Sequence, residues 1–255
     1  MMKTVYEHPK YYEIAFSFRD IGAEVDVFEQ CFKKYAELPV KSILELASGN
    51  SPHMEELLKR GYAYTGLDIS DSMLRYSREK ASRIEGKATL VRADMNDFSL
   101  SESFDFAFIS LGSLCARNTE DILSHFRSVA RALKKGGLYL MDNCVCFAPF
   151  SDQDKSWTIE QDKIKVTARS SGRLIDAVEQ LVEVTTSLKV KDDGSACQLF
   201  ETAIVRVNYA KEFLQIIERT RELEFVGWWN NWNLQEPITE GLEKIARPIT
   251  LLRRK

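Results

Sequence analysis

The chain has 255 residues, of which 44% are hydrophobic and 29% charged, and its formal net charge is −3. This length is enough to bury one α/β core and to carry a smaller appended unit. A nucleic-acid-binding domain usually has a basic stripe, but the basic runs here are short, at Lys33-Lys34, Lys134-Lys135 and Arg253–Lys255. The balance of charge therefore argues against a nucleic-acid partner.

No segment has the composition of a signal peptide or a membrane span. The first ten residues lack an apolar run, and the most apolar stretch, Phe104–Ala116, is shorter than a span and contains Asp105. The five cysteines are odd in number and do not have zinc-site spacing; Cys144 and Cys146 are expected to be small core residues on one face of a strand. We therefore expect a cytoplasmic protein with no membrane association, no disulfide and no metal.

The first half of the chain predicts a helix followed by alternating strands and helices. Tyr6–Tyr35 has the spacing of one helix. The next strands are predicted at Ser42–Ala47, Ala63–Asp68, Ala88–Ala93, Phe104–Ser110 and Leu138–Asp142. The intervening helices are predicted from Ser51, as N-cap, to Arg60, from Ser70 or Asp71 to Ile84, and over Glu120–Lys135, which Gly136-Gly137 ends. Short apolar strands with such crossovers predict a parallel sheet covered on both faces.

After Asp142 the pattern changes to long β-like stretches. These are Lys163–Ser170, Leu174–Val190 and Cys197–Val207, with a turn at Asp192-Asp193-Gly194. A helix over Lys211–Leu223 and strands over Glu224–Trp229 and Ile249–Arg253 then return to the main sheet.

The predicted fold is α/β, a Rossmann-like, mainly parallel seven-stranded sheet with helices on both faces and an antiparallel β insert after strand five. We divide it into an N-terminal helical cap (1–36), a main domain (37–150 and 209–255) and the insert (151–208), which would serve as a lid or a dimer interface.

The turn after the first strand points to a particular kind of ligand. A dinucleotide site requires G-x-G-x-x-G, so that a pyrophosphate can approach the backbone, whereas this loop has only Gly49. S-adenosylmethionine carries no phosphate. It needs one close backbone approach and a carboxylate near the strand end, which Gly49 and Glu45 supply.

Acidic residues follow the next two strands. Asp68 lies 23 residues after Glu45, close to the spacing of about 20 at which an acid accepts hydrogen bonds from ribose hydroxyls; the alternative is a helix N-cap. Asp94 would accept from an adenine amino group, with Met95 on the ring face; the alternative is an Asp-rich turn. Ser110 ends strand four, beside the position expected for the methyl group.

These motifs together resemble the class I S-adenosylmethionine-dependent methyltransferases. The resemblance covers Val40–Asn143, with Glu45–Gly49, Gly66–Ser70, Ala93–Met95 and Leu133–Gly137 in the family's order. Asn50-Ser51 departs from it, because the family more often has another glycine there. The cofactor residues that the resemblance implies are Tyr12, Arg19, Glu45, Ala47, Ser48, Gly49, Asp68, Ile69, Met73, Asp94, Met95, Asn96, Ser110 and Leu111.

The appended parts resemble a narrower group, the small-molecule N-methyltransferases such as the amino-sugar dimethyltransferases and the glycine or sarcosine methyltransferases. By that resemblance Tyr12 closes over the cofactor and Arg19 pairs with its carboxylate; the alternatives are helix packing and a surface ion pair. Candidate substrate residues are Tyr11, Ser113, Trp228, Trp229 and Trp232, although core packing is the alternative for each tryptophan. We expect His53 to be exposed and His125, in mid-helix between Ile122 and Phe126, to lie at the boundary between the buried and exposed faces, so neither is assigned as a general base.

The predicted function is in-line transfer of the methyl group of S-adenosylmethionine to a small-molecule acceptor, leaving S-adenosylhomocysteine. One alternative is an RNA or protein methyltransferase, against which the low charge argues. The other is a non-catalytic regulatory protein that binds S-adenosylmethionine, since fold does not fix function. The β insert is also a candidate interface for a homodimer.

Overall fold

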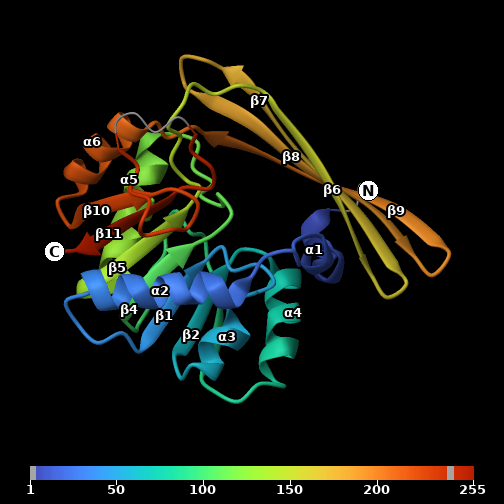
Figure 1. Ribbon diagram of the computed structural model, residues 1–255, viewed down its shortest axis with the longest axis horizontal. Coiled ribbons are helices and arrows are strands. Elements are labelled where there is room, and N and C mark those ends of the chain that lie inside the picture. The colour runs from blue at the N-terminus through green and yellow to red at the C-terminus, as the bar shows by residue number, and fades with distance from the viewer. Residues whose placement is uncertain (1–3, 240–243) are drawn as a thin grey trace.

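A computed structural model describes residues 4–239 and 244–255, so the first three residues of the predicted cap lie outside the described residues. The main body is a seven-stranded sheet in the order β10-β11-β5-β4-β1-β2-β3 (Figure 1). Its strands are β1 (Ser42–Leu46), β2 (Ala63–Asp68), β3 (Ala88–Arg92), β4 (Phe104–Ile109), β5 (Leu133–Asp142), β10 (Leu223–Trp229) and β11 (Ile249–Arg254). The first five strands pair in parallel, and β11 runs antiparallel to both β5 and β10.

Helices cover both faces of this sheet. One face carries α2 (Ile21–Tyr35), α3 (Met54–Lys59) and, beside α3, α4 (Asp71–Ala81); the other carries α5 (Thr119–Ala132) and α6 (Ala210–Thr220) (Figure 1). Phe28 of α2 packs with ring centroids 4.7 Å from Phe108 of β4, and Phe126 of α5 lies 5.7 Å from Phe213 of α6. The predicted parallel sheet with two covered faces is therefore confirmed.

A second, four-stranded antiparallel sheet is inserted after β5 and projects from the body (Figure 1). It consists of β6 (Gln153–Gln161), β7 (Ile164–Asp176), β8 (Leu181–Asp192) and β9 (Ser195–Arg206), with the predicted turn at Asp193-Gly194. The two ends of the insert meet in a short neck. There the amide of Cys146 donates to the carbonyl of Asn208 (2.8 Å), and the amide of Ala210 donates to the carbonyl of Cys146 (3.1 Å).

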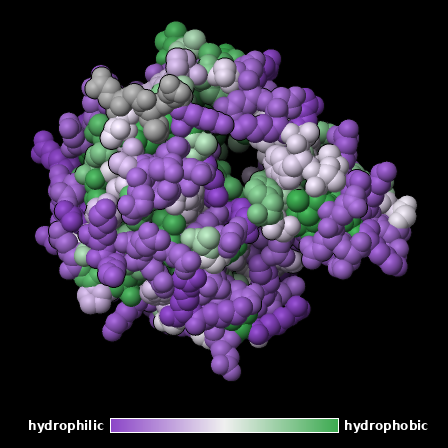
Figure 2. All heavy atoms as spheres, in the orientation of Figure 1, coloured by the Kyte–Doolittle hydropathy of each residue, from purple (hydrophilic) through white to green (hydrophobic). Residues whose placement is uncertain are grey.

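The N-terminal segment lies between the insert and the body. Its short helices η1 (Val5–Glu7) and α1 (Pro9–Ala15) pack on β6–β9 and also contact α4. Val5 and Ile14 are buried against Leu199 of β9, and the indole Nε1 of Trp157 donates to the carbonyl of Ala15 at 2.6 Å. Because α1 touches both units, it forms one wall of the space between them. Figure 2 shows this space as a hollow beside the projecting sheet.

The structure corrects four expectations about individual elements. The predicted stretch Leu174–Val190 is not continuous, because β7 ends at Asp176 and a turn leads to β8, which begins at Leu181. Tyr6–Tyr35 is not one helix, because Ser17 bonds back to the carbonyl of Ile14 (2.9 Å) and Asp20 caps a new helix at the amide of Ala23 (2.9 Å). The predicted helix over Glu120–Lys135 ends at Ala132, because Leu133 is extended and pairs with Phe104 as the start of β5.

The expected N-cap at Ser51 is also wrong. Ser51 has φ 49° and its hydroxyl caps no amide, and α3 begins at Met54.

Two further observations concern the cysteines after β5 and the length of the helices. Cys144 and Cys146 do not lie on a strand; they are half-buried in the loop after β5. Within residues 4–239 and 244–255, none of the helices is long and apolar enough to cross a membrane.

Candidate cofactor site

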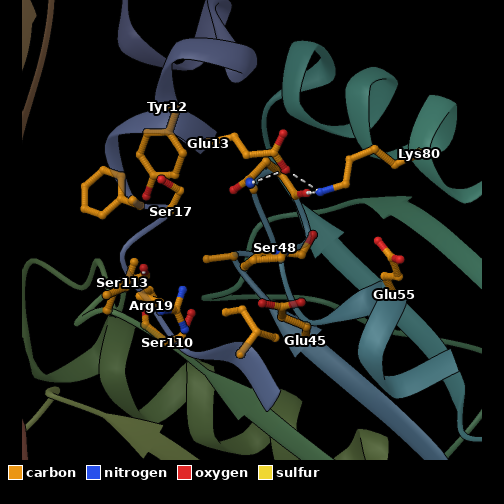
Figure 3. A pocket seen from close by; sticks show the side chains of 17 residues that line it. Tyr12, Glu13, Ser17, Arg19, Glu45, Ser48, Glu55, Lys80, Ser110 and Ser113 are labelled. Atoms are coloured by element: carbon orange, nitrogen blue, oxygen red, sulfur yellow. Dashed lines mark hydrogen bonds and ion pairs between the residues drawn. The ribbon is translucent and has the colours of Figure 1, made fainter. Parts of the chain in front are cut away.

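A cavity of about 230 Å³ opens at the carboxyl ends of β1 and β4, beneath α1 (Figure 3). Open α/β sheets bind their ligands at this edge. The lining residues come from α1, the bend after it and the start of α2, from β1 and the loop after it, from α3, from α4 and from the loop after β4. They are Tyr12, Glu13, Phe16, Ser17, Arg19, Ile21, Glu45, Ala47, Ser48, Gly49, Asn50, Pro52, Glu55, Lys80, Ser110, Leu111 and Ser113.

The loop after β1 is held in its turn by Asp68. The Asp68 carboxylate accepts from the amide of Gly49 (2.7 Å) through Oδ2 and from the amide of Ser70 (2.8 Å) through Oδ1. Ala47 and Gly49 have φ of 49° and 52°, so the chain curls tightly around the strand end. Burial raises the pKa of Asp68, against the lowering effect of these amides. Each carboxylate oxygen keeps a lone pair for a further donor, as a ribose hydroxyl would require.

Glu45 reaches the cavity wall but is already paired. Its Oε2 accepts from the hydroxyl of buried Tyr64 at 2.5 Å, and its Oε1 lies 3.1 Å from Nδ1 of His53. Glu45 is 1% exposed. Its carboxylate is therefore the floor of the site and belongs to an internal network.

His53 is fully buried, so the expectation that it is exposed is wrong. Its Nε2 lies 2.9 Å from Oε2 of Glu24 while its Nδ1 faces Glu45, so each ring nitrogen meets a carboxylate. Burial alone would lower the pKa of His53, but these two carboxylates outweigh it and raise that pKa. The two carboxylates thus favour the protonated ring, which can donate on each side, against the opposing charge of Arg19, whose Nη2 lies 3.2 Å from Nε2.

Arg19 joins the same network from the bend between α1 and α2. Its Nε donates to Oε1 of Glu24 (3.1 Å), its Nη2 also donates to Glu24, and its side chain is only 3% exposed. In Figure 3 Arg19 lies between Ser110 and Glu45, facing the cavity. A guanidinium fixed in this way suits a carboxylate ligand.

A second half of the network comes from residues that the sequence analysis did not single out. Arg247 donates from Nη2 to Oδ2 of Asp142 (2.8 Å) and from Nη1 to Oε1 of Glu24 (2.8 Å). Asp142 is completely buried at the end of β5 and also accepts from the amide of Leu111 (2.8 Å). The only sequence signal was the position of Asp142 at a strand end. Glu24 and Arg247 come from distant segments with no motif.

Glu13 fastens α1 over the loop after β1. Its carboxylate accepts from Nζ of Lys80 (2.5 Å) and from the hydroxyl of Tyr76, both on α4, and from Nδ2 of Asn50 (3.3 Å). Figure 3 shows this cluster at one side of the cavity, with Tyr12 from the same helix at another. The Tyr12 ring packs on Phe16 with centroids 4.6 Å apart, and burial raises its pKa to about 12.

The cavity brings together only part of the predicted cofactor set. Tyr12, Arg19, Glu45, Ala47, Ser48, Gly49, Ser110 and Leu111 line it, whereas Asp68, Ile69, Met73, Asp94, Met95 and Asn96 do not. The second group follows β2 and β3, the neighbouring strands of the sheet. Met73 is buried in α4, Ile69 is exposed, and Oδ1 of Asp94 accepts from the amide of Asn96 at 2.8 Å.

The predicted substrate residues are scattered. Ser113 lines the cavity, and the hydroxyl of Tyr11 donates to Asp192 of the insert (2.9 Å). Trp229 packs in the core against Tyr35, and Trp228 packs against Phe147. Buried Trp232 donates from Nε1 to Oδ1 of Asp142 at 2.9 Å, next to Leu111, and Arg247 lies over its ring. None of the three tryptophans lines the cavity.

Known proteins match this arrangement. Residues 43–137 fit the family described as "Methyltransferase domain". The chain is 32% identical over 131 residues, 47% of its length and 53% of the relative, to the YqeM protein of Bacillus subtilis (strain 168), itself only provisionally assigned as a methyltransferase.

It is 27% identical over 164 residues, 62% of its length and 65% of the relative, to dTDP-3-amino-3,4,6-trideoxy-alpha-D-glucopyranose N,N-dimethyltransferase of Streptomyces venezuelae. The chain thus spans about half to two thirds of the length of these curated relatives.

The fold extends further than the sequence matches. The crystal structure of DesVI from Streptomyces venezuelae superposes with a TM-score of 0.76 at 18% identity, covering 97% of this chain and 98% of that one. At that identity the likeness concerns the fold, including the inserted sheet. Residues 43–137 therefore match a methyltransferase domain, and the chain shares its overall fold with DesVI.

Proposed function

We propose that this protein transfers the methyl group of S-adenosylmethionine to a small-molecule acceptor, by in-line displacement at the sulfonium carbon. The observation that carries the proposal is the position of Arg19. This guanidinium is held at the cavity wall next to a loop that offers backbone and hydroxyl groups but no pyrophosphate cradle. It fits a ligand that has an amino-acid carboxylate at one end and no phosphate.

The residues present fit the cofactor. Arg19 would hold its carboxylate, the loop from Ala47 to Gly49 would lie along its methionine end, and Asp68 would accept from its ribose hydroxyls. Asp94 and Met95 would contact the adenine. Ile69, Met73 and Asn96 would complete this end, and Ser110 and Leu111 would border the methyl group. Tyr12 would cover the sulfonium, whose positive charge favours an aromatic face.

The cofactor supplies an already activated methyl group, so the protein's task is orientation. The ring of His53 is held between two carboxylates, and it positions Glu45 and Arg19 without serving as a base. Ser110 and Ser113 lie at the cavity margin, where an acceptor would enter. An acceptor that arrives protonated would lose its proton to solvent or to a group of its own.

The substrate class rests on the relatives. The Streptomyces venezuelae relative is named as an N,N-dimethyltransferase of an amino sugar nucleotide, so an amine on a small molecule is the acceptor we favour. The insert (151–208) would then act as a lid over the hollow that Figure 2 shows. The cap (1–36) and the main domain (37–150 and 209–255) would enclose the cofactor, with Tyr11 on the lid side.

Binding tests the first half of this proposal. S-adenosylhomocysteine should raise the melting temperature in a concentration-dependent manner, because a ligand that binds only the native state stabilises it. Asp68→Asn should remove the shift. Asp71→Asn should keep it, because Asp71 is 70% exposed and its ion pair among the described residues is with Arg92, at 3.2 Å. An absence of any shift at millimolar ligand would contradict the cofactor assignment.

Transfer tests the second half. The protein would be incubated with methyl-labelled cofactor and a panel of amino sugars, amino acids and other small amines, with a parallel RNA and protein panel. Label should pass to a small amine in the wild type and not in Asp68→Asn. Label that passed only to RNA or protein would contradict the small-molecule assignment, and binding without transfer to any acceptor would favour a regulatory role.

A further inference from the structure

His125 is fully buried in the middle of α5, and not at the boundary between the buried and exposed faces of the helix where the sequence placed it. Its Nδ1 lies 2.8 Å from the carbonyl oxygen of Met95, and its Nε2 lies 2.8 Å from the hydroxyl of Tyr139 on β5. Burial lowers the pKa of the ring to about 4. The side chain is therefore a neutral imidazole with two partners, and it takes no part in the ionic network around His53.

The partners fix which nitrogen carries the proton. A carbonyl oxygen can only accept, so Nδ1 must donate to Met95. A neutral ring has no second N–H, so Nε2 accepts from the hydroxyl of Tyr139, which burial keeps protonated by raising its pKa. The hydrogen bonds thus run in one direction, from β5 through α5 to the backbone of the loop after β3.

That loop is fixed to α5 at a second place. The amide of Phe98 donates to the hydroxyl of Ser128 (3.2 Å), and Nη2 of Arg131 donates to the carbonyl of Phe98 (3.1 Å). At its other side, Nδ2 of Asn96 donates to the carbonyl of Cys115 (2.9 Å), in the loop after β4. The segment that would contact the adenine is therefore positioned by a buried scaffold.

We propose that His125 is a positioning residue for adenosine recognition: as the Nδ1–H tautomer, with Tyr139 bonded to its Nε2, it holds the Met95 carbonyl and so fixes the loop of Asp94 and Met95 for the adenine ring. The proposal rests on the proposed function, because it assumes that this loop receives the adenine. The role in ligand binding is indirect, because α5, which carries His125, contributes no residue to the lining of the cavity. Such support for a binding group, one step removed from the ligand, commonly changes affinity severalfold or more.

Two half-replacements separate the two hydrogen bonds. In His125→Asn the amide nitrogen stands where Nδ1 stood and can still donate to Met95. In His125→Gln the amide stands where Nε2 stood and can still meet Tyr139, while the bond to Met95 is lost. Tyr139→Phe removes the hydroxyl and leaves the ring. Phe213→Leu is the matched control, because Phe213 packs against α5 through Phe126 and is remote from the loop.

The measurement is the dissociation constant of S-adenosylhomocysteine, and separately of 5′-methylthioadenosine, by titration calorimetry, together with the melting temperature of each variant. We expect His125→Gln to weaken both ligands about tenfold, and His125→Asn and Tyr139→Phe to stay within about threefold of the wild type. Phe213→Leu should lower the melting temperature with wild-type affinity.

Equal weakening in the Asn and Gln variants, wild-type affinity in His125→Gln, or loss of affinity in Phe213→Leu in step with its stability would each overturn the positioning role. A loss for S-adenosylhomocysteine without a loss for 5′-methylthioadenosine would also overturn it, because the effect would then lie at the methionine end. If the wild type bound neither ligand, the proposed function itself would fall, and the two failures are thus distinguishable.

Discussion

Nδ1 of His53 lies 3.1 Å from Oε1 of Glu45, and the two side chains are 0% and 1% exposed. Glu45 lies one residue before the end of β1, beside the loop to which we assign the methionine end of the cofactor. Its carboxylate faces the ring of His53, whose pKa Glu45 and Glu24 raise against the effect of burial. The net charge of the side chains beside the cavity therefore depends on whether His53 is protonated.

The first prediction concerns pH. The pKa of His53 is raised on folding above its ordinary value of 6.5. The stability that its proton confers is then fully present below that value and is lost as the pH rises through the folded pKa. The free energy of unfolding should fall over this range by up to about 1.4 kcal/mol per pH unit for the single proton. Urea unfolding from pH 6 upward should show this slope, and His53→Gln should flatten it; an unchanged slope in the variant would contradict the assignment.

Glu24 sets the acid side of the same profile. Burial would raise its pKa, but His53 and Arg19 outweigh burial and lower that pKa well below its ordinary value of 4.5. This contribution is present above pH 4.5 and is lost as the pH falls through the folded pKa. Glu24→Gln should therefore reduce the acid sensitivity of unfolding below pH 4.5 and lower stability at neutral pH. Urea unfolding from pH 5 to pH 3 measures this, and a profile parallel to that of the wild type would contradict it.

Arg247 should matter to both folding and binding. Arg247→Met leaves Glu24 and completely buried Asp142 short of a cation, so we expect a loss of about 2 kcal/mol, less than for a fully buried pair because Arg247 is 33% exposed. Guanidinium unfolding checks this. The double variant Arg247→Met with Asp142→Asn should recover part of the loss. If the two losses simply add, the pair does not interact.

Glu13 should affect cofactor affinity through α1. Glu13→Ala removes the contacts that hold α1 to Tyr76, Lys80 and Asn50 above the loop. We expect the dissociation constant of S-adenosylhomocysteine to rise about threefold to tenfold. Glu55→Gln is the control, because Glu55 lines the same cavity but pairs only with exposed Lys59 (2.7 Å). Equal effects of the two variants would show that charge in the cavity, and not closure by α1, is responsible.

Gly66 should not tolerate a side chain. A Cβ there would lie 2.8 Å from Oγ of Ser48, in the loop after β1, and 2.8 Å from the hydroxyl of Tyr64, which donates to Glu45. Gly66→Ala should lower the free energy of unfolding by about 1–3 kcal/mol and raise the dissociation constant of the cofactor. Gly22→Ala, in helix α2 with no neighbour closer than 3.5 Å to the added carbon, should be neutral or slightly stabilising. Denaturant unfolding of both variants decides it.

The sequence predicted the strands of the main sheet well because each is a short apolar run between turn signals, and this information is local. It missed β6 (Gln153–Gln161), whose side chains are mostly exposed along an edge of the inserted sheet, so that only Trp157 and Ile159 mark its inner face. The pairing of β6 with β7 is a tertiary property. Propensity within the segment itself could not have indicated it.

The candidate site shows the same division. The turn at Gly49 and the acid at Asp68 were predictable from spacing, and the structure joins them by a hydrogen bond of 2.7 Å. The burial of His53 was not predictable, because it depends on Glu24, which is 29 residues away and belongs to another helix. A polar residue in the first turn of a helix is usually exposed; only its partners reveal otherwise.

The neck at Cys146 and Asn208 also bears on how such a protein can vary. Because the inserted sheet leaves and rejoins the body at neighbouring points, its strands can lengthen or shorten without moving β5 or α6. The ionic network, in contrast, closes between Arg19 and Arg247, near opposite ends of the chain. We infer that the insert can be remodelled without disturbing this network, whereas a fragment cut to the matched domain at 43–137 would retain His53 and Glu45 but lose Glu24, Arg19 and Arg247.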